Sequence, residues 1–409
     1  MAQKRDIEGQ RLHRFELSDQ NRTVRWVLII ILLVIAAIAI TTALTKALET
    51  PTGWQSIQAS SGGLNCSHEF GLQYDIGAGD MPASEERKAI NSLYSELTTK
   101  AWLIFYCEAV ENDVVGIRKL NSSPNAELTV DAALYQALEQ ITAEGNRSVY
   151  FGPVYAAYDN LFQSDDAVTA QSNDPTTDAV TREYVQTLAD FAGDPQHVSL
   201  ELRGENRVFL QVSSEYLQFL ADNGAERILD FGWLRSAFVI DYMAQQLENA
   251  GFTNGYLFGV DGCIRNLDTR PASFTMNVFM EDKLAVLMEY SSGTSIVALR
   301  SYPLYEENQG NYYTFQDGRT VSAMIDLTDG QSKCATPDLV AYAADKSCAQ
   351  LAMSVAPVYI SDSLTKEAMD SLIQQGINTL WKEGSTVCYT QQDLQFTLND
   401  KALSAQCKN

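Results

Sequence analysis

The sequence has few histidines and a shortage of basic residues. It holds 3 histidines and 29 lysines and arginines, against 52 aspartates and glutamates, which gives a net charge of −23. Proteins that bind nucleic acid contact phosphates through clustered lysine and arginine, so we do not expect a chain this acidic to bind nucleic acid. Only His68 and His197 follow the first 25 residues, and a histidine-based nucleophilic site is not expected on either of them.

Several common site motifs are missing as well. The sequence contains no glycine-rich P-loop, no G-x-G-x-x-G, no C-x-x-C pair and no zinc-ligand spacing. The seven cysteines are therefore expected to serve mainly as buried side chains or as disulfides. Local bridges are expected for Cys334 with Cys348 and for Cys388 with Cys407. The full connectivity stays open, and the odd number leaves at least one thiol over.

One long apolar run stands near the N-terminus, at residues 26 to 44 (WVLIIILLVIAAIAITTAL). At about 1.5 Å per residue, a helix of this length crosses a hydrocarbon core of roughly 30 Å. Six basic residues precede the run, which places the N-terminus in the cytoplasm by the positive-inside rule. A cleaved signal peptide is the alternative, but its apolar part and its charged leader are usually shorter. We therefore predict a single-pass protein of the cell membrane whose bulk is extracytoplasmic.

The chain then divides into four parts. Residues 1–25 form a cytoplasmic tail, 26–46 a transmembrane helix, 47–68 a linker rich in Ser, Gly and Thr, and 69–409 one extracytoplasmic domain. The polar and acidic stretch 163–181 is predicted to be a long surface loop inside that domain.

Apolar periodicity predicts both helices and strands in this domain. Helices are expected over residues 84–105, with Ser84 as the N-cap, and over residues 129–146, ended by Gly145. Two short strands around residues 204–206 are typical of a hairpin.

The second half of the domain is also predicted to contain both helices and strands. Residues 227–263 are predicted to form a strand, a turn, a helix over about 234–250 ended by Gly251, and a second strand. Three β-rich runs follow at 274–280, 284–291 and 294–302, and then a buried helix at 338–356. The fold class is therefore α+β, a mixed α/β sandwich.

In this order the segments resemble the FAD:protein FMN transferases, the ApbE family, over about residues 86 to 360. The family pattern D-L-G-G-I-A-K-G-x-x-x-D is similar to DFGWLRSAFVID at residues 230–241, where Asp230, Gly232 and Asp241 match. The Gly-Gly pair that ends the next family strand corresponds to Asp261 and Gly262.

Three other family patterns have counterparts. G-A-F-D-P-T-V-G-P is similar to GNRSVYFGP at residues 145–153, H-I-I-D-P-x-T-G to AMIDLTDG at residues 323–330, and A-D-x-x-x-T to ADKSCA at residues 344–349. The matching residues include Asp326, Gly330 and Asp345.

The resemblance implies a site for FAD and Mg²⁺, and it also implies that several residues of that site are replaced. It implies contacts to FAD and a Mg²⁺ ligand at Asp345, the FAD contacts being Asp230, Gly232, Arg235, Asp241, Asp261, Gly262, Asp326 and Gly330. The family's Lys, His and metal-binding Thr are replaced by Ser236, Ala323 and Ala349, and a family Gly by Trp233. Asp345 and position 349 are four residues apart and are expected to share one helix face, so with Ala349 one oxygen ligand is missing and the Mg²⁺ site is incomplete. Arg235 is expected either to pair with a phosphate or to form an ordinary salt bridge.

Two functions remain open at this point. The first is an ApbE-like module that binds flavin or an envelope protein partner, with transferase activity reduced or lost and no catalytic residue assigned. The second is an active Mg²⁺-dependent enzyme that attaches FMN to a partner protein. Tyr-rich stretches at 150–162 and 302–315 either line a groove for flavin, peptide or glycan, or pack in the core.

Overall fold

The computed structural model describes residues 22–48, 50–60, 64–109, 113–281 and 283–408. They belong to two units, Met1–Pro51 and Thr52–Asn409. The first unit contains helix α1 (Arg22–Leu48), which includes the predicted span 26–46. Within the described part of the chain, no helix combines the length and the apolar character needed to cross a membrane. The anchor stays a prediction, and most of the predicted tail lies outside the described residues.

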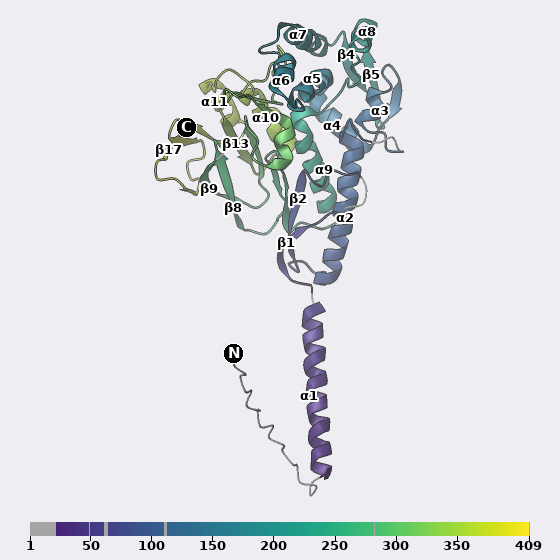
Figure 1. The fold of residues 1–409 in the computed structure, drawn as a ribbon, viewed down its shortest axis with the longest axis vertical. Helices are drawn as coiled ribbons and strands as arrows, with labels where there is room; N and C mark the ends of the chain where they lie inside the picture. Colours follow the sequence, from purple (N-terminus) through teal and green to yellow (C-terminus); the bar gives the residue numbers. More distant parts are fainter. Residues whose placement is uncertain (1–21, 49, 61–63, 110–112, 282, 409) are drawn as a thin grey trace, which may run out of the picture. The chain divides into compact units, whose positions relative to one another are not determined.

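A nine-stranded sheet forms the centre of Thr52–Asn409 (Figure 1). Neighbouring strands are antiparallel except for the last pair, β15 and β17, which is parallel. In spatial order the strands are β1 (Gly53–Ile57), β2 (Phe70–Ile76), β6 (Gly255–Gly259), β7 (Cys263–Asn266), β10 (Ser295–Arg300), β13 (Asp338–Ala343), β14 (Asn378–Glu383), β15 (Thr386–Tyr389) and β17 (Ser404–Cys407).

Each face of this sheet is covered by a different layer. Helices α2 (Ala83–Phe105), α9 (Arg235–Asn249) and α10 (Cys348–Tyr359) contact one face, and α11 (Lys366–Gln374) packs on α10. A small sheet of β16 (Phe396–Leu398), β9 (Lys283–Ser291) and β8 (Ser273–Met280) covers the other. Successive residues of a strand point to opposite faces, so Val297 and Leu299 join the core under the helices while Ile296 and Ala298 join the core under the small sheet.

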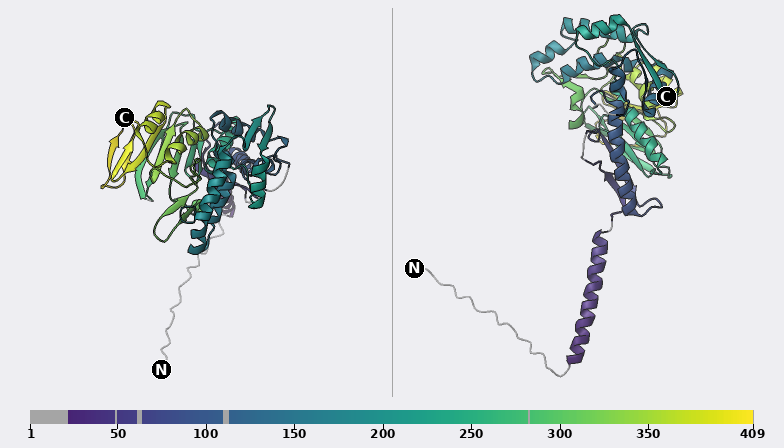
Figure 2. Two further views of the ribbon diagram at one scale, coloured as in Figure 1. Left: turned by 90° about the horizontal axis from the view of Figure 1, so that it is seen from above. Right: turned by 90° about the vertical axis from the view of Figure 1, so that its right-hand side faces the viewer.

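A group of helices with a second small sheet occupies the end of this unit away from β1 (Figures 1 and 2). Its members are α3 (Ile117–Asn121), α4 (Ala132–Ala143), α5 (Gly152–Phe162), α6 (Ala167–Asn173), α7 (Ala179–Gly193), α8 (Ser214–Asp222), β3 (Glu127–Thr129), β4 (Val198–Leu202) and β5 (Arg207–Val212). Short elements near the site are the 3₁₀ turns η2 (Ser148–Phe151), η3 (Gly232–Leu234) and η4 (Glu306–Asn311), and the hairpin of β11 (Tyr312–Thr314) and β12 (Thr320–Ser322).

Many predicted elements are present, and the mixed α+β class is confirmed. Helices α2, α4 and α9, the β4–β5 hairpin, and strands β8, β9 and β10 lie where periodicity placed them. The predicted cap of α2 is wrong, because Pro82 is the N-cap residue and Ser84 lies inside the helix.

The predicted helix at 338–356 is half wrong, since its first part is strand β13. That strand is central, and each of its residues is buried. Leu339 and Ala341 face the helices, while Val340 and Tyr342 face the small sheet. A strand buried on both faces shows no alternation, so its sequence cannot be told from that of a buried helix.

Two predicted loops contain regular structure instead. The stretch 163–181 holds α6 and the start of α7, capped by Asp166 and Asp178, whose carboxylates accept backbone hydrogen bonds. The predicted linker 47–68 contains β1, which pairs with β2 along its whole length. Capping carboxylates and a short edge strand resemble solvated loop residues in sequence alone.

No disulfide joins any of the seven cysteines, all of which lie within the described residues. Cys334 is exposed whereas Cys348 is buried at the start of α10. On the parallel pair β15–β17, Cys407 lies opposite Tyr389 and not opposite Cys388. Adjacent residues of a strand point to opposite faces, so Cys388 and Cys407 do not meet.

The strand predicted at the start of residues 227–263 does not form, because a side chain takes its hydrogen bonds. The amide oxygen of Asn121 accepts from the backbone N–H of Ile228 (3.2 Å) and of Leu229 (2.7 Å), and its amide nitrogen donates to Leu229 O (2.9 Å). The N–H of Asp230 donates to Val149 O at 2.8 Å. One asparagine thus replaces a neighbouring strand and fixes the segment that leads into η3 and α9.

This arrangement predicts a large cost for Asn121→Ala. The substitution leaves the backbone N–H groups of Ile228 and Leu229 unpaired, while Leu229 O keeps, among the described residues, only the Cys107 thiol as a donor. We expect a loss of about 2–4 kcal/mol in the free energy of unfolding. Denaturant unfolding of the full chain measures it, with Asn160→Ala, at an exposed position of α5, as the matched control. A change as small as the control's would show that Asn121 does not hold the segment.

Candidate functional site

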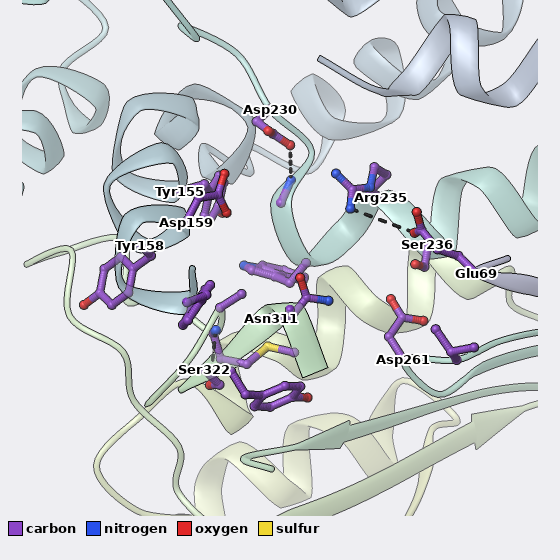
Figure 3. Close-up of a pocket in the computed structure, with 18 of the residues that line it drawn as sticks. Glu69, Tyr155, Tyr158, Asp159, Asp230, Arg235, Ser236, Asp261, Asn311 and Ser322 are labelled. Atoms are coloured by element: carbon purple, nitrogen blue, oxygen red, sulfur yellow. Dashed lines mark hydrogen bonds and ion pairs between the residues drawn. The ribbon is translucent and has the colours of Figure 1, made fainter. Parts of the chain in front are cut away.

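A cavity of about 440 Å³ lies where the turn η3 meets α5, the start of α9 and the turn after β6. Its size is within the range of small-molecule sites. Figure 3 shows Tyr155, Tyr158 and Asp159 of α5 on one side, and Ser236, Glu69 and Asp261 on the other. The cavity therefore draws on segments far apart in the sequence.

Arg227 ties three of these segments together at the cavity. Its guanidinium bonds Glu108 Oε1 at 2.8 Å, Asp159 Oδ2 at 2.8 Å and Asp230 Oδ2 at 3.2 Å. Burial would lower the pKa of Arg227, but these carboxylates raise it above its ordinary value. Burial raises the pKa of Asp159 despite the nearby guanidinium. The cation is thus surrounded by acids of the protein itself.

The turn that follows is set by Asp230 and Gly232. Asp230 is 2% exposed, and its Oδ1 accepts the Gly232 N–H at 2.8 Å. Gly232 has φ of +50°, and a Cβ there would lie 2.4 Å from the ring of Tyr155. No residue with a side chain fits, which explains why the glycine stands here. Trp233 comes next and packs against the hydrophobic core.

Arg235 is held by Glu69 and Tyr106. Its guanidinium lies 4.0 Å from Glu69 Oε2 and 4.4 Å from the ring centroid of Tyr106, whose hydroxyl donates to Glu69 at 2.9 Å. Burial would lower the pKa of Arg235, but Tyr106 and the carboxylates raise it. Of the two roles expected for Arg235, the structure contains the salt bridge.

Buried polar atoms with incomplete hydrogen bonding gather around the cavity. Five of its lining residues each hold a buried side-chain atom without a well-formed hydrogen bond to any described residue: Trp102 Nε1, Tyr155 Oη, Trp233 Nε1, Arg235 Nε and Asp261 Oδ1. Among them Tyr155 has Trp233 as its polar neighbour, and Asp261 has Ser236. An unpaired buried polar group costs about 1–3 kcal/mol, and such groups are rare in native proteins. Their concentration at one cavity indicates that a polar ligand or bound water completes it.

Two solved structures resemble the chain over most of their length. The ApbE protein of Thermotoga maritima aligns with a TM-score of 0.52 and 14% identity, over 81% of this chain and 94% of its own. The flavin transferase ApbE of Vibrio cholerae aligns with a TM-score of 0.53 and 14% identity, over 85% and 97%. The chain has the fold of the ApbE flavin transferases. No protein-family model and no curated protein matches its sequence.

The resemblance seen in the motifs is thus confirmed as a shared fold. Four of the eight residues predicted to contact FAD line the cavity: Asp230, Gly232, Arg235 and Asp261. Ser236 and Ala323, which stand where the resemblance aligns the family's Lys and His, line it too. Positions 236 and 323 lie far apart in the sequence, and the fold brings them to the same cavity.

The other four predicted residues do not line the cavity. Asp241 caps α10 instead, because its two carboxylate oxygens accept the N–H groups of Cys348 (2.9 Å) and Ala349 (2.8 Å). Burial raises the pKa of Asp241. Asp326 binds Lys333 Nζ at 2.7 Å and closes the loop that contains Gly330.

The last of the four is Gly262, which is also structural. A Cβ at this position would lie 2.4 Å from Ala298 O, and its φ is +106°. A glycine therefore lets the β6–β7 turn approach strand β10.

The residues do not fit the Mg²⁺ site that the resemblance implied. Helix α10 begins at Cys348, so Asp345 lies before it and shares no helix face with Ala349. Asp345 is exposed and outside the cavity, and both oxygens of Asp241 are occupied. Within the described residues, no group of three His, Cys, Asp or Glu side chains is placed to hold a metal.

Sequence reasoning missed Glu69, Trp102, Tyr106, Glu108 and Arg227. None stands in a family motif, and only the fold brings them to the turn. The aromatic stretches were a partial signal: Tyr155, Tyr158, Phe162 and Tyr312 line the cavity, whereas Tyr150 accepts the Leu200 N–H in the core.

The burial of the Asp261 carboxyl predicts that Asp261→Asn raises stability in a pH-dependent way. Burial, with a contribution from Glu69, raises the pKa of this carboxyl, so the folded state loses stability as the pH rises above the ordinary value of about 3.9. Asparagine does not ionise, and we expect the variant to melt about 1–3 °C higher than the parent at pH 7, with the gain shrinking towards pH 4.

Melting curves of the full chain across that pH range test this. Asp345→Asn, at an exposed position outside the cavity, is the control and should change stability by less than about 0.5 kcal/mol. A parent more stable than Asp261→Asn at pH 7 would contradict the assignment.

Proposed function

We propose that this chain is a flavin-binding protein with the ApbE fold whose transferase activity is reduced or lost. The observation that carries the proposal is the composition of the cavity: side chains able to stack and hydrogen-bond remain, while Ser236 and Ala323 occupy the positions where the resemblance aligns Lys and His. The Vibrio cholerae neighbour is a flavin transferase, which supports a flavin as the ligand class.

FAD fits this cavity only in part. The aromatic lining suits the flavin ring, which stacks and hydrogen-bonds at its edge. A pyrophosphate needs cations or backbone N–H groups, and Trp233 stands where the resemblance aligns a glycine. When bound, a flavin would supply its redox-active ring, and the chain's own residues would orient that ring and exclude water from it.

The active transferase is the less favoured function. The retained Asp230 and Asp241 serve the turn and the helix cap, so their presence does not indicate catalysis. The residues do not fit Mg²⁺, and we assign no step to that ion. Membrane anchoring, an extracytoplasmic location and an envelope protein partner stay predictions of the sequence.

A product assay separates the two functions. We expect the full chain, purified in detergent and incubated with FAD and Mg²⁺, to release FMN or AMP barely above the protein-free rate. Ser236→Lys with Ala323→His should raise that rate about a hundredfold, the usual contribution of a positioned acid or base. Adding Ala349→Thr tests the metal position, although this alanine is fully buried and the triple variant must first be shown to fold.

Ala344→His is the control, since it places a histidine at an exposed position outside the cavity. Rapid turnover by the parent would contradict reduced activity. No gain in the folded double variant would show that these two positions alone do not account for it.

A further inference from the structure

We infer that the cavity takes a flavin without phosphate groups, riboflavin or its ring system, in preference to FMN or FAD. This inference rests on the proposed flavin function and specifies its ligand. It depends on three features of the cavity: its charge, the state of its two arginines and its unpaired polar atoms.

The lining of the cavity carries more acids than bases. Six carboxylates line it against two guanidiniums, and its described lining contains no lysine: the acids are Glu69, Glu108, Asp159, Asp230, Asp261 and Glu307. The bases are Arg227, Arg235 and His68, and the Nε2 of His68 lies 3.5 Å from Glu69 Oε1. With the carboxylates and guanidiniums ionised and the histidine neutral, four negative charges are unmatched. A phosphate ester would add about two more, and the unmatched carboxylates would repel them.

Neither arginine is available to a phosphate. Arg227 already contacts three carboxylates at 2.8–3.2 Å, and Arg235 is paired with Glu69 and stacked on Tyr106. To bind a phosphate, Arg227 would have to leave Asp230, whose side chain is 3% exposed, and Arg235 would have to leave Glu69, whose side chain is 18% exposed. Either change would leave a largely buried carboxylate without its cation, which costs more than an ordinary hydrogen bond returns.

The unpaired atoms match a neutral ring with several acceptors and one donor. Three of these atoms can only donate: the Nε–H of Arg235 and the Nε1–H of Trp102 and Trp233. The exposed edge of a flavin ring offers carbonyl and ring-nitrogen acceptors to such donors. The single N–H of the flavin ring can in turn donate to Asp261 Oδ1. The hydroxyl of Tyr155 can do either. Tyr155, Trp233 and Tyr312 supply aromatic surface beside them.

Fluorescence titration of the full chain with riboflavin, FMN and FAD, each with and without Mg²⁺, tests the inference. We expect riboflavin to bind at least about tenfold more tightly than FMN or FAD at low ionic strength, with the ratio narrowing at about 0.5 M salt as the repulsion is screened. Mg²⁺ should not reverse the order.

Glu307→Gln sharpens the test, because Glu307 is an exposed carboxylate at the cavity. Removing its charge should raise affinity for FMN about two- to fivefold and affinity for riboflavin by less. Glu367→Gln, at an exposed position of α11 outside the cavity, is the matched control and should change neither.

The outcomes distinguish the preference for riboflavin from the proposed binding of flavins in general. Equal or tighter binding of FMN or FAD, with or without Mg²⁺, overturns the preference for riboflavin and leaves the flavin function standing. If none of the three flavins binds, the proposed function fails and the inference fails with it.

Discussion

The contacts of Arg227 with Glu108, Asp159 and Asp230 organise the site. They join the loop after α2, helix α5 and the turn before α9, so three segments distant in the sequence share one cation. Asp230 then receives the Gly232 N–H, and this places Trp233 and Arg235 at the cavity. Loss of the guanidinium would leave three carboxylates facing one another, and the turn would lose its fixed position.

The same contacts shape the chemistry of the cavity. A cation that neutralises acids of the protein is not available to neutralise a phosphate, and Arg235 is committed to Glu69 in the same way. What remains at the cavity is aromatic surface and buried polar atoms without well-formed hydrogen bonds in the described part of the chain. A cavity with this lining in an ApbE fold suits the ring of a flavin better than its phosphates.

The sequence predicted the parts of the fold that depend on local pattern. The amphipathic face of α4, with Leu134 and Leu138 buried, and the Gly204 hairpin follow from periodicity and turn residues. Strand β13 was missed because burial on both faces erases alternation. The strand expected at 227–230 is absent because Asn121, more than a hundred residues earlier, takes its backbone hydrogen bonds.

The site residues also divide into those indicated by the sequence and those fixed only by contacts between distant segments. The resemblance to the family implied FAD contacts at Asp230, Gly232, Arg235 and Asp261, and these four residues line the cavity. It assigned Asp241 to the ligand, whereas that carboxylate caps α10. Glu69 and Arg227 could not be predicted, because their partners are fixed only by the way the chain folds.

The most direct measurement is a crystal structure of the full chain grown with riboflavin. We predict that the flavin ring lies inside the cavity, beside Trp233 and within hydrogen-bonding distance of Arg235 Nε and Asp261, with Arg227 still bound to Asp159 and Asp230. A ring bound elsewhere, or a cavity in which ordered water pairs with each of the five polar atoms, would contradict it.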